Sequence, residues 1–218
     1  MRPEQLFSQE DQQRIAETVK AAELATSGEI VPFVVGQSDQ YPEAPLRLGF
    51  LTAFLVVFTM AILDIAMNIW LPFGIGEAAI YTVLGFGLGW IAGFFVTPLR
   101  RLVLQSTIME QRVDERASMA FLAEEVFNTR ERTGILIFLS LFERRVRVMG
   151  DNGINAKVEQ EEWDGIVALI VDAMKNNQPA EGLIKAIERC GSHLEKSGVE
   201  IRDDDTNELD NSLRMSDK

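Results

Sequence analysis

The chain is poor in the residues that mark secreted and metal-binding proteins. Its 218 residues include one cysteine, Cys190, and one histidine, His193. A lone cysteine cannot form an internal disulfide, so nothing indicates an oxidising compartment. One cysteine and one histidine also argue against a structural zinc site. Residues 1–14 are polar where a signal peptide has an apolar core, so we expect no signal peptide.

Positive charge is also scarce. Lysine and arginine total 21 against 33 acidic residues, which gives a formal net charge of −12. Such a charge opposes nucleic-acid phosphates, and no basic stripe offsets it, so we expect no nucleic-acid partner. The sequence also lacks a P-loop and the H-E-x-x-H, G-x-S-x-G and C-x-x-C motifs, which leaves no standard catalytic signature.

Long apolar runs are present, and they lie inside the chain. Residues 46–70 and 77–97 are each close to the roughly 20 apolar residues that cross a hydrocarbon core. The first run contains Asp64, which we place near the far interface. The short linker between the runs favours a tight turn. We therefore predict a transmembrane hairpin with two spans, and a lipid bilayer as its environment.

The flanking charges predict an orientation for this hairpin. Arg47 precedes the first run, and Arg100 and Arg101 follow the second. All three lie on one side, so the positive-inside rule predicts that both termini are cytoplasmic. The expected location is the inner (plasma) membrane of a bacterium.

Gly85, Gly89 and Gly93 recur every four residues in the second run and share one helical face. Small residues at this spacing allow two helix backbones to approach closely. We predict that this face packs on the first span of the same chain. Self-association through the hairpin is the alternative, and it would make an oligomer.

The polar parts of the chain alternate between helical and strand patterns. Ser8 and Asp11 have the spacing of a capping box at the start of the first helix. Pro32 suggests that the first strand is at an edge or carries a bulge. We predict helices at about 8–25, 102–128, 163–176 and 180–196, strands at 29–35, 135–141 and 145–149, and no regular structure from residue 199.

One strand before the hairpin and two after it are too few for separate sheets. We therefore predict a single α/β domain formed by residues 1–45 and 98–198. The hairpin, residues 46–97, is an insertion in this domain, and residues 199–218 form an acidic tail.

Several ordered stretches resemble one family. Residues 22–30, with Thr26-Ser27-Gly28-Glu29, resemble the opening of the TPM domain, and so do residues 129–146 followed by 150–154. Residues 204–210 look like the tail of a bacterial membrane-anchored branch of that family. The resemblance implies an α/β sandwich of a small mixed sheet and helices. It also implies kinship with proteins linked to photosystem II repair, and with a plant member to which acid phosphatase activity is attributed.

Polar residues near the predicted strand ends are the candidate catalytic and metal-binding groups. Glu29 opens the first strand, Asp151 follows the third, and Arg130 precedes the second. Two carboxylates could hold Mg²⁺ or Ca²⁺, and an arginine could bind phosphate. The alternative is structural: the residues around Glu29 turn the chain, and Asp151 begins a turn.

In the tail, Asp203 and Asp205 alternate like the first ligands of a calcium loop, but the glycine and the closing glutamate of that loop are missing. A tail that docks on the domain or on a partner is the other interpretation. Cys190 and His193 fall within a predicted helix and are interpreted as structural residues.

These features support two hypotheses for function. The first is a membrane-anchored, non-enzymatic module that binds or maintains a membrane protein complex. The alternative is a metal-dependent phosphomonoesterase that uses Glu29 and Asp151.

Overall fold

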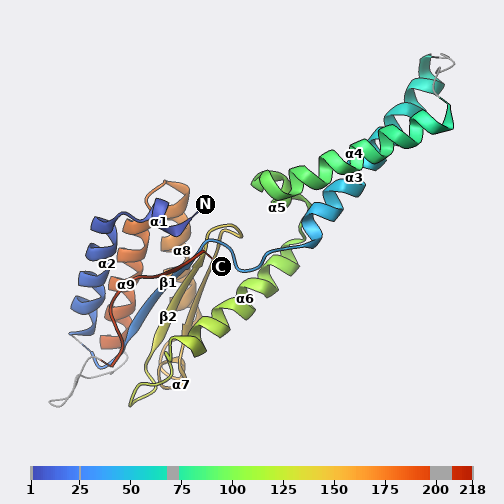
Figure 1. Cartoon of the computed structure of the whole chain (residues 1–218). Helices are drawn as coiled ribbons and strands as arrows, with labels where there is room; N and C mark the ends of the chain where they lie inside the picture. Colours follow the sequence, from blue (N-terminus) through green and yellow to red (C-terminus); the bar gives the residue numbers. More distant parts are fainter. Residues whose placement is uncertain (1, 25, 68–73, 197–207, 218) are drawn as a thin grey trace. The chain divides into compact units, whose positions relative to one another are not determined.

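The computed structural model describes residues 2–24, 26–67, 74–196 and 208–217 (Figure 1). The chain divides into two compact units. The first contains Met1–Asp39 and Glu110–Lys218, and the second contains Gln40–Met109. The predicted turn between the two apolar runs lies partly outside the described residues.

The first unit is built on a mixed four-stranded sheet in the order β3-β2-β1-β4. Strand β1 runs parallel to both β2 and β4, while β3 is antiparallel to β2. The predicted joining of the first strand with the later two is therefore confirmed. The strands are β1 (Ile30–Val35), β2 (Ile135–Ser140), β3 (Arg145–Gly150) and β4 (Arg214–Ser216).

Helices cover both faces of this sheet. On one face lie α2, α8 and α9, and on the other lies α6 (Figure 1). The helices of this unit are α1 (Pro3–Leu6), α2 (Gln9–Glu23), α6 (Ser106–Ala123, which begins in the second unit), α7 (Asn152–Asn155), α8 (Gln160–Lys175) and α9 (Pro179–Lys196). The α/β sandwich expected from the resemblance is confirmed.

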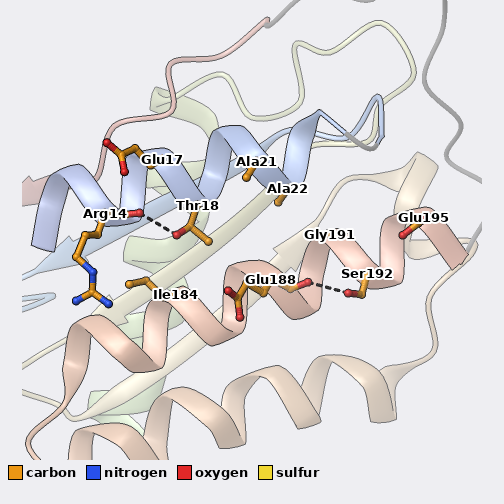
Figure 2. Close-up of a pocket in the computed structure, with 10 residues that line it drawn as sticks. All are labelled: Arg14, Glu17, Thr18, Ala21, Ala22, Ile184, Glu188, Gly191, Ser192 and Glu195. Carbon is orange, nitrogen blue, oxygen red and sulfur yellow. Dashed lines mark hydrogen bonds between the residues drawn. The ribbon is translucent and has the colours of Figure 1, made fainter.

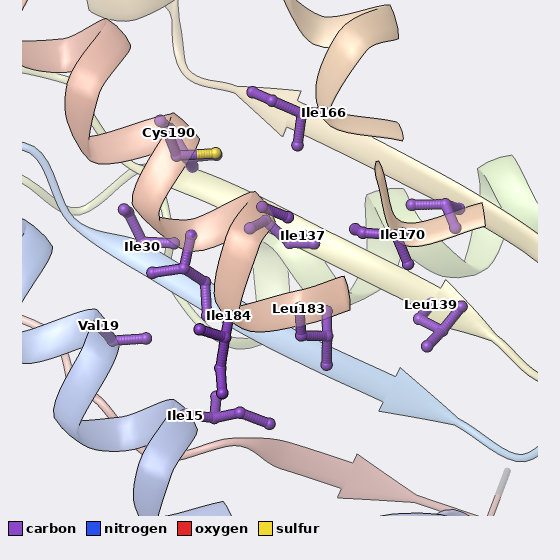
Figure 3. Close-up of a cluster of buried hydrophobic side chains, with 14 of the residues drawn as sticks. Ile15, Val19, Ile30, Ile137, Leu139, Ile166, Ile170, Leu183, Ile184 and Cys190 are labelled. Carbon is purple, nitrogen blue, oxygen red and sulfur yellow. The ribbon is translucent and has the colours of Figure 1, made fainter. Parts of the chain in front are cut away.

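The period-two pattern of the strands explains the two cores. One face of the sheet carries Ile30 and Val34 of β1 and Ile137 of β2, and it packs against the helices α2, α8 and α9. The helix residues in this core include Ile15 and Leu183 (Figure 3). The opposite set of side chains, including Val31, Phe33 and Phe138, packs against α6. Because both faces are covered, β1 and β2 are buried at every position, as a continuous apolar run predicts.

Helix α2 begins where the sequence predicts the first helix, although the short α1 before it was not predicted. The hydroxyl of Ser8 accepts from the Asp11 N–H at 3.1 Å, and the Asp11 carboxylate accepts from the Ser8 N–H at 3.0 Å. This reciprocal capping box satisfies two backbone donors that the first turn leaves without helical partners.

The tail differs from its prediction. Residues 214–216 form β4, which pairs with Phe33–Val35 of β1, and the Gly36 N–H donates to the Ser216 carbonyl at 2.9 Å. Strand β1 would otherwise present an open edge, and the tail supplies the missing hydrogen-bond partners. Pro32 therefore lies in an inner strand, but just before the stretch that β4 covers.

The long helix predicted at 102–128 is broken at both ends. Leu104 is extended and buried, which separates α5 from α6. After α6, Glu125 has a φ of 52°, and the turn directs Val126 into the core. In both places, burying one apolar side chain stabilises the fold more than continuing the helix would.

The second unit contains the hairpin. Helices α3 (Glu43–Met67) and α4 (Ile75–Phe95) are both long and apolar enough to cross a membrane, and α5 (Thr97–Val103) follows them. The contacts pair Pro45 with Gly93 and Val56 with Gly85, so α3 and α4 are antiparallel.

The three spaced glycines lie against α3. A Cβ atom added at Gly89 would come within 2.1 Å of the Thr52 hydroxyl oxygen and 2.5 Å of the Leu48 carbonyl oxygen. The same hydroxyl donates to the Gly85 carbonyl oxygen at 2.7 Å. This glycine face is therefore occupied within the chain. Asp64 is exposed and does not point into the α3–α4 contact.

Candidate functional site

Polar side chains gather at one end of the sheet. Because β1, β2 and β4 are parallel, the segments before them meet at the same end, and antiparallel β3 finishes there. The segments that meet are residues 26–29, 129–134, 150–151 and 208–211. This sheet end includes all three site residues predicted in the globular part of the chain, Glu29, Arg130 and Asp151.

Glu29 is buried and forms a carboxyl pair with Glu23. One oxygen of Glu29 accepts from the Glu208 N–H at 3.0 Å. Glu23 accepts from the Ile30 N–H at 2.9 Å and from the side-chain amide of Asn211, and it shares a hydrogen bond with Glu29. The pair therefore connects the end of α2, the start of β1 and the segment before β4.

Burial, helped by the neighbouring Glu29 charge, raises the pKa of Glu23 to about 8, and the hydrogen bonds from Ile30 and Asn211 act in the opposite direction. At neutral pH Glu23 is therefore mainly protonated and can donate its proton to Glu29. Sequence reasoning missed Glu23 as a site residue. The available signal was an acidic residue in the last turn of a helix, where the helix dipole disfavours negative charge.

Asp151 is held by an arginine. Arg132 donates from Nη2 to Asp151 Oδ1 at 3.0 Å and from Nε to the other oxygen. This bidentate bond raises the pKa of the Arg132 guanidinium. Asp151 Oδ1 also accepts from the Asn152 N–H at 2.7 Å and so caps α7. The buried Asp151 thus begins a short helix, at the place where the sequence suggested a turn.

The loop before β2 is fastened to its neighbours by short polar contacts. Thr133 donates to the Ser27 carbonyl at 3.0 Å, and the Ser27 hydroxyl donates to Glu131 at 3.2 Å. The Arg130 N–H donates to the Glu208 carboxylate at 3.1 Å. Glu208 therefore links the backbone of Arg130 to the Glu29 carboxylate.

The predicted metal ligands are distributed over separate contacts. Glu29 is paired with Glu23, and Asp151 with Arg132, while Asp203 and Asp205 lie outside the described residues. Within the described part of the chain, no three His, Cys, Asp or Glu side chains are arranged to hold a metal ion. Of the four predicted metal ligands, only Glu29 and Asp151 lie in the described part of the chain.

Cys190 and His193 are buried in α9. Burial raises the pKa of the Cys190 thiol to about 12, so thiolate chemistry is suppressed at neutral pH. His193 accepts from Arg189 Nε at 2.9 Å. Its Nδ1 lies 2.9 Å from a carboxylate oxygen of Glu162, but without the alignment of a hydrogen bond.

An open groove of about 510 Å³ runs along α2 and α9 (Figure 2). The helices are parallel, because Arg14 pairs with Glu181 and Ala22 lies against Gly191. The groove is lined by Arg14, Glu17, Thr18, Ala21, Ala22, Ile184, Glu188, Gly191, Ser192 and Glu195.

The available charge in this groove is negative. Glu17, Glu188 and Glu195 line it, whereas its one cation, Arg14, is already paired with Glu181. The hydroxyls of Thr18 and Ser192 donate to carbonyls of their own helices (Figure 2). Sequence reasoning missed the groove, since it depends on how two distant helices pack.

Residues 99–193 match the model of the TPM domain family. The chain contains a TPM domain. The resemblance read from residues 129–146 and 150–154 is thus confirmed, while residues 22–30 and 204–210 lie outside the matched stretch. The match begins after the hairpin, while β1 and α2, which precede it, belong to the same compact unit as the matched strands and helices.

A solved structure is similar in fold. It is the NMR structure of BA42 protein from the psychrophilic bacterium Bizionia argentinensis, with 20% identity and a TM-score of 0.58. The alignment covers 95% of this chain and 94% of BA42. No curated protein matches the chain.

Proposed function

We propose that this TPM domain protein is anchored in the bacterial inner membrane, where it binds or maintains a membrane protein complex without catalysing a reaction. The observation that carries the proposal is the position of the apolar hairpin. It interrupts the chain between β1 and β2, two strands that pair with each other. Both ends of the hairpin therefore return to the TPM domain and tether it to the same bilayer.

The surface of the hairpin supports a lipid environment. Large apolar side chains on α3 and α4 are exposed, including Phe50, Phe54, Val83 and Leu88, each with more than half of its surface accessible. Soluble proteins rarely expose apolar patches of this extent. Arg47, Arg100 and Arg101 lie at the open end of the hairpin, which favours cytoplasmic termini.

The groove between α2 and α9 is the surface that we assign to the partner. Its exposed acidic side chains, Glu17, Glu188 and Glu195, fit a basic segment. Membrane proteins carry an excess of lysine and arginine in their cytoplasmic loops. A basic helical segment at the cytoplasmic side of an integral membrane protein therefore has both the charge and the location that this groove requires.

Site-specific photocrosslinking in native membranes tests this assignment. A photoreactive side chain at Ala21 or Ser192, both in the groove, should crosslink one stoichiometric integral membrane protein. The same probe at Leu169, on the exposed side of α8, is the positional control. Equal capture from the groove and from Leu169 would show that the groove has no specific partner.

Charge reversal supplies the matched variants. Replacing Glu17, Glu188 and Glu195 by lysine should abolish the groove crosslink. The control has the same change in net charge, with lysine at three exposed acids outside the groove, Glu4, Glu161 and Asp164. If both triple variants lose the crosslink equally, overall charge rather than the groove governs binding.

The alternative function is a metal-dependent phosphomonoesterase. The carboxyl pair of Glu23 and Glu29 favours it, because a protonated and an ionised carboxyl at one site can serve as acid and base. In this alternative Glu29, Asp151, Asp203 and Asp205 supply oxygen ligands for Mg²⁺ or Ca²⁺, and Arg130 binds phosphate.

Hydrolysis of an aryl phosphate by the full chain in detergent, with added Mg²⁺ or Ca²⁺, tests this alternative. The enzyme hypothesis requires activity that falls strongly in Glu29→Gln and Asp151→Asn. Activity that both variants retain would remove these residues from the mechanism, and a chain inactive with both metals supports the binding module.

A further inference from the structure

In the short helix α5, apolar side chains are exposed and charged side chains are partly buried, which is the reverse of a helix that faces water. Leu102 is 76% exposed, and Leu99 is also exposed. Arg100 and Arg101 are only partly exposed, although arginine is normally among the most exposed residues. In α5, leucine therefore faces outward while arginine lies back against the protein.

Two backbone contacts fix this arrangement. Arg100 Nη2 donates to the Gln40 carbonyl at 2.8 Å, before the start of α3. Arg47 Nη1, in the first part of α3, donates to the Val103 carbonyl at 3.0 Å, at the end of α5. Both bonds hold α5 at the base of the hairpin, where it contacts α3 and α4.

The exposed leucines continue the apolar surface of the hairpin. Phe95, the last residue of α4, is 82% exposed, and Val96, where the chain turns into α5, is also exposed. The apolar surface that begins on α4 thus extends around the turn onto α5. It does not end where the long helix ends.

The length of α4 locates this turn relative to a bilayer. Its 21 residues give a helix about 32 Å long, close to the ~30 Å thickness of the hydrocarbon core. When α4 spans that core, Val96 falls at its boundary, and α5 starts in the headgroup region. Arginines near this level can reach headgroup phosphates while neighbouring apolar side chains enter the acyl region.

We propose that α5 is a membrane-interface helix that binds the surface of a phospholipid bilayer. Leu99 and Leu102 insert at the boundary of the acyl region, and the positive charge of Arg47, Arg100 and Arg101 at the same level attracts anionic headgroups. The proposal rests on the membrane anchoring proposed above and adds a second mode of lipid contact. It makes α5 the element that fixes the depth of the hairpin.

Spin-label accessibility tests the proposal on the full chain in vesicles of phosphatidylethanolamine and phosphatidylglycerol. A label at Leu102→Cys reports on α5, and labels at Phe58→Cys and Gln105→Cys report on the middle of α3 and on the segment after α5. Leu24→Cys is the matched control, an exposed leucine outside the hairpin. Native Cys190 is buried, with its thiol pKa raised to about 12, so its labelling at neutral pH is suppressed.

The expected result is that oxygen broadens the Leu102 signal more than a water-soluble nickel chelate does. Its depth should lie between those of Phe58 and Gln105, and Leu24 should be fully accessible to nickel. Replacing phosphatidylglycerol by phosphatidylcholine should move Leu102 toward water.

Three outcomes would contradict the proposal, and they are distinguishable. If Leu102 is as accessible to nickel as Leu24 while Phe58 is protected, the hairpin is anchored but α5 is not in the interface. If Phe58 is accessible as well, the membrane anchoring itself is wrong. If lipid charge has no effect on a protected Leu102, the arginines have no part in binding.

Discussion

The two units of this protein place the same residue types in opposite positions. In the globular unit, large apolar side chains such as Ile170 and Leu183 are buried, while most charged residues, with exceptions such as Glu29 and Asp151, face outward. In the hairpin, phenylalanine and leucine face outward, and Gly85, Gly89 and Gly93 are the buried residues of α4. Burial therefore has a different basis in each unit: removal of apolar area from water in one, and close backbone packing in the other.

Truncation of a large apolar side chain should reveal the largest difference in stability effects between the two units. Leu183→Ala in the core should lower the free energy of unfolding by about 2–5 kcal/mol, because it leaves a cavity. Leu88→Ala, which removes the same atoms from a 70% exposed position on α4, should change it by less than about 0.5 kcal/mol in detergent. Urea unfolding in micelles measures both. Similar losses at the two positions would mean that Leu88 is buried in an unrecognised contact.

The glycine face of α4 should tolerate enlargement of a side chain poorly, whereas the lipid-facing side should tolerate it well. Gly89→Val forces a side chain against Thr52 and the Leu48 carbonyl, and we expect a cost of about 1–3 kcal/mol in hairpin packing. Gly87→Val is the matched control, since a Cβ atom there meets nothing within 4 Å. A disulfide engineered between α3 and α4 should form less efficiently in the first variant only. If Gly87→Val impairs it equally, the packing face is assigned incorrectly.

The carboxyl pair should make the globular unit pH-sensitive in a way that the hairpin is not. Because the folded pKa of Glu23 is raised to about 8 from an ordinary value of 4.5, its protonated form stabilises the fold. This contribution is complete below pH 4.5 and is lost as the pH rises through 8. Glu23→Gln should therefore lose less stability than the wild type between pH 5 and 9, by a few kcal/mol, since each pKa unit corresponds to about 1.4 kcal/mol.

Urea unfolding at several pH values measures this difference, with exposed Glu17→Gln as the control. Parallel pH profiles for the wild type and Glu23→Gln would show that Glu23 titrates normally in the folded protein.

The capping box gives the smallest expected effect. Ser8→Ala removes the acceptor for the Asp11 N–H and should cost about 1 kcal/mol in the globular unit. Ser118→Ala, on the exposed side of α6, is the control, because its hydroxyl only returns to the Asp114 carbonyl of the same helix. Thermal unfolding detects the difference, and equal melting temperatures would remove Ser8 as a stabilising cap.

Local patterns were sufficient to predict much of this fold. The uninterrupted apolar run of β1 and the alternation in β3 predict strands, and too few strands on either side of the hairpin predict one shared sheet. Strand β4 could not be predicted, because Arg214, Met215 and Ser216 have no strand pattern and are ordered by the open edge of β1. Leu104 breaks the long helix for a similar reason, since its burial depends on tertiary packing.

The candidate site was predictable only in part. Strand ends pointed to Glu29 and Asp151, but not to their partners. Glu23 reaches Glu29 because α2 ends beside the start of β1, and Glu208 arrives from a segment distant in sequence. The groove combines residues of α2 and α9, and no local spacing connects these helices.

Extraction of native membranes with alkaline carbonate tests the central claim most directly. The claim is that α3 and α4 cross the bilayer as a hairpin inserted into the TPM domain. The full chain should remain in the membrane pellet, and a variant with residues 43–103 replaced by a short glycine–serine linker should appear in the supernatant. A full chain released by carbonate would contradict the claim, because its apolar surface would then be covered by protein and not by lipid.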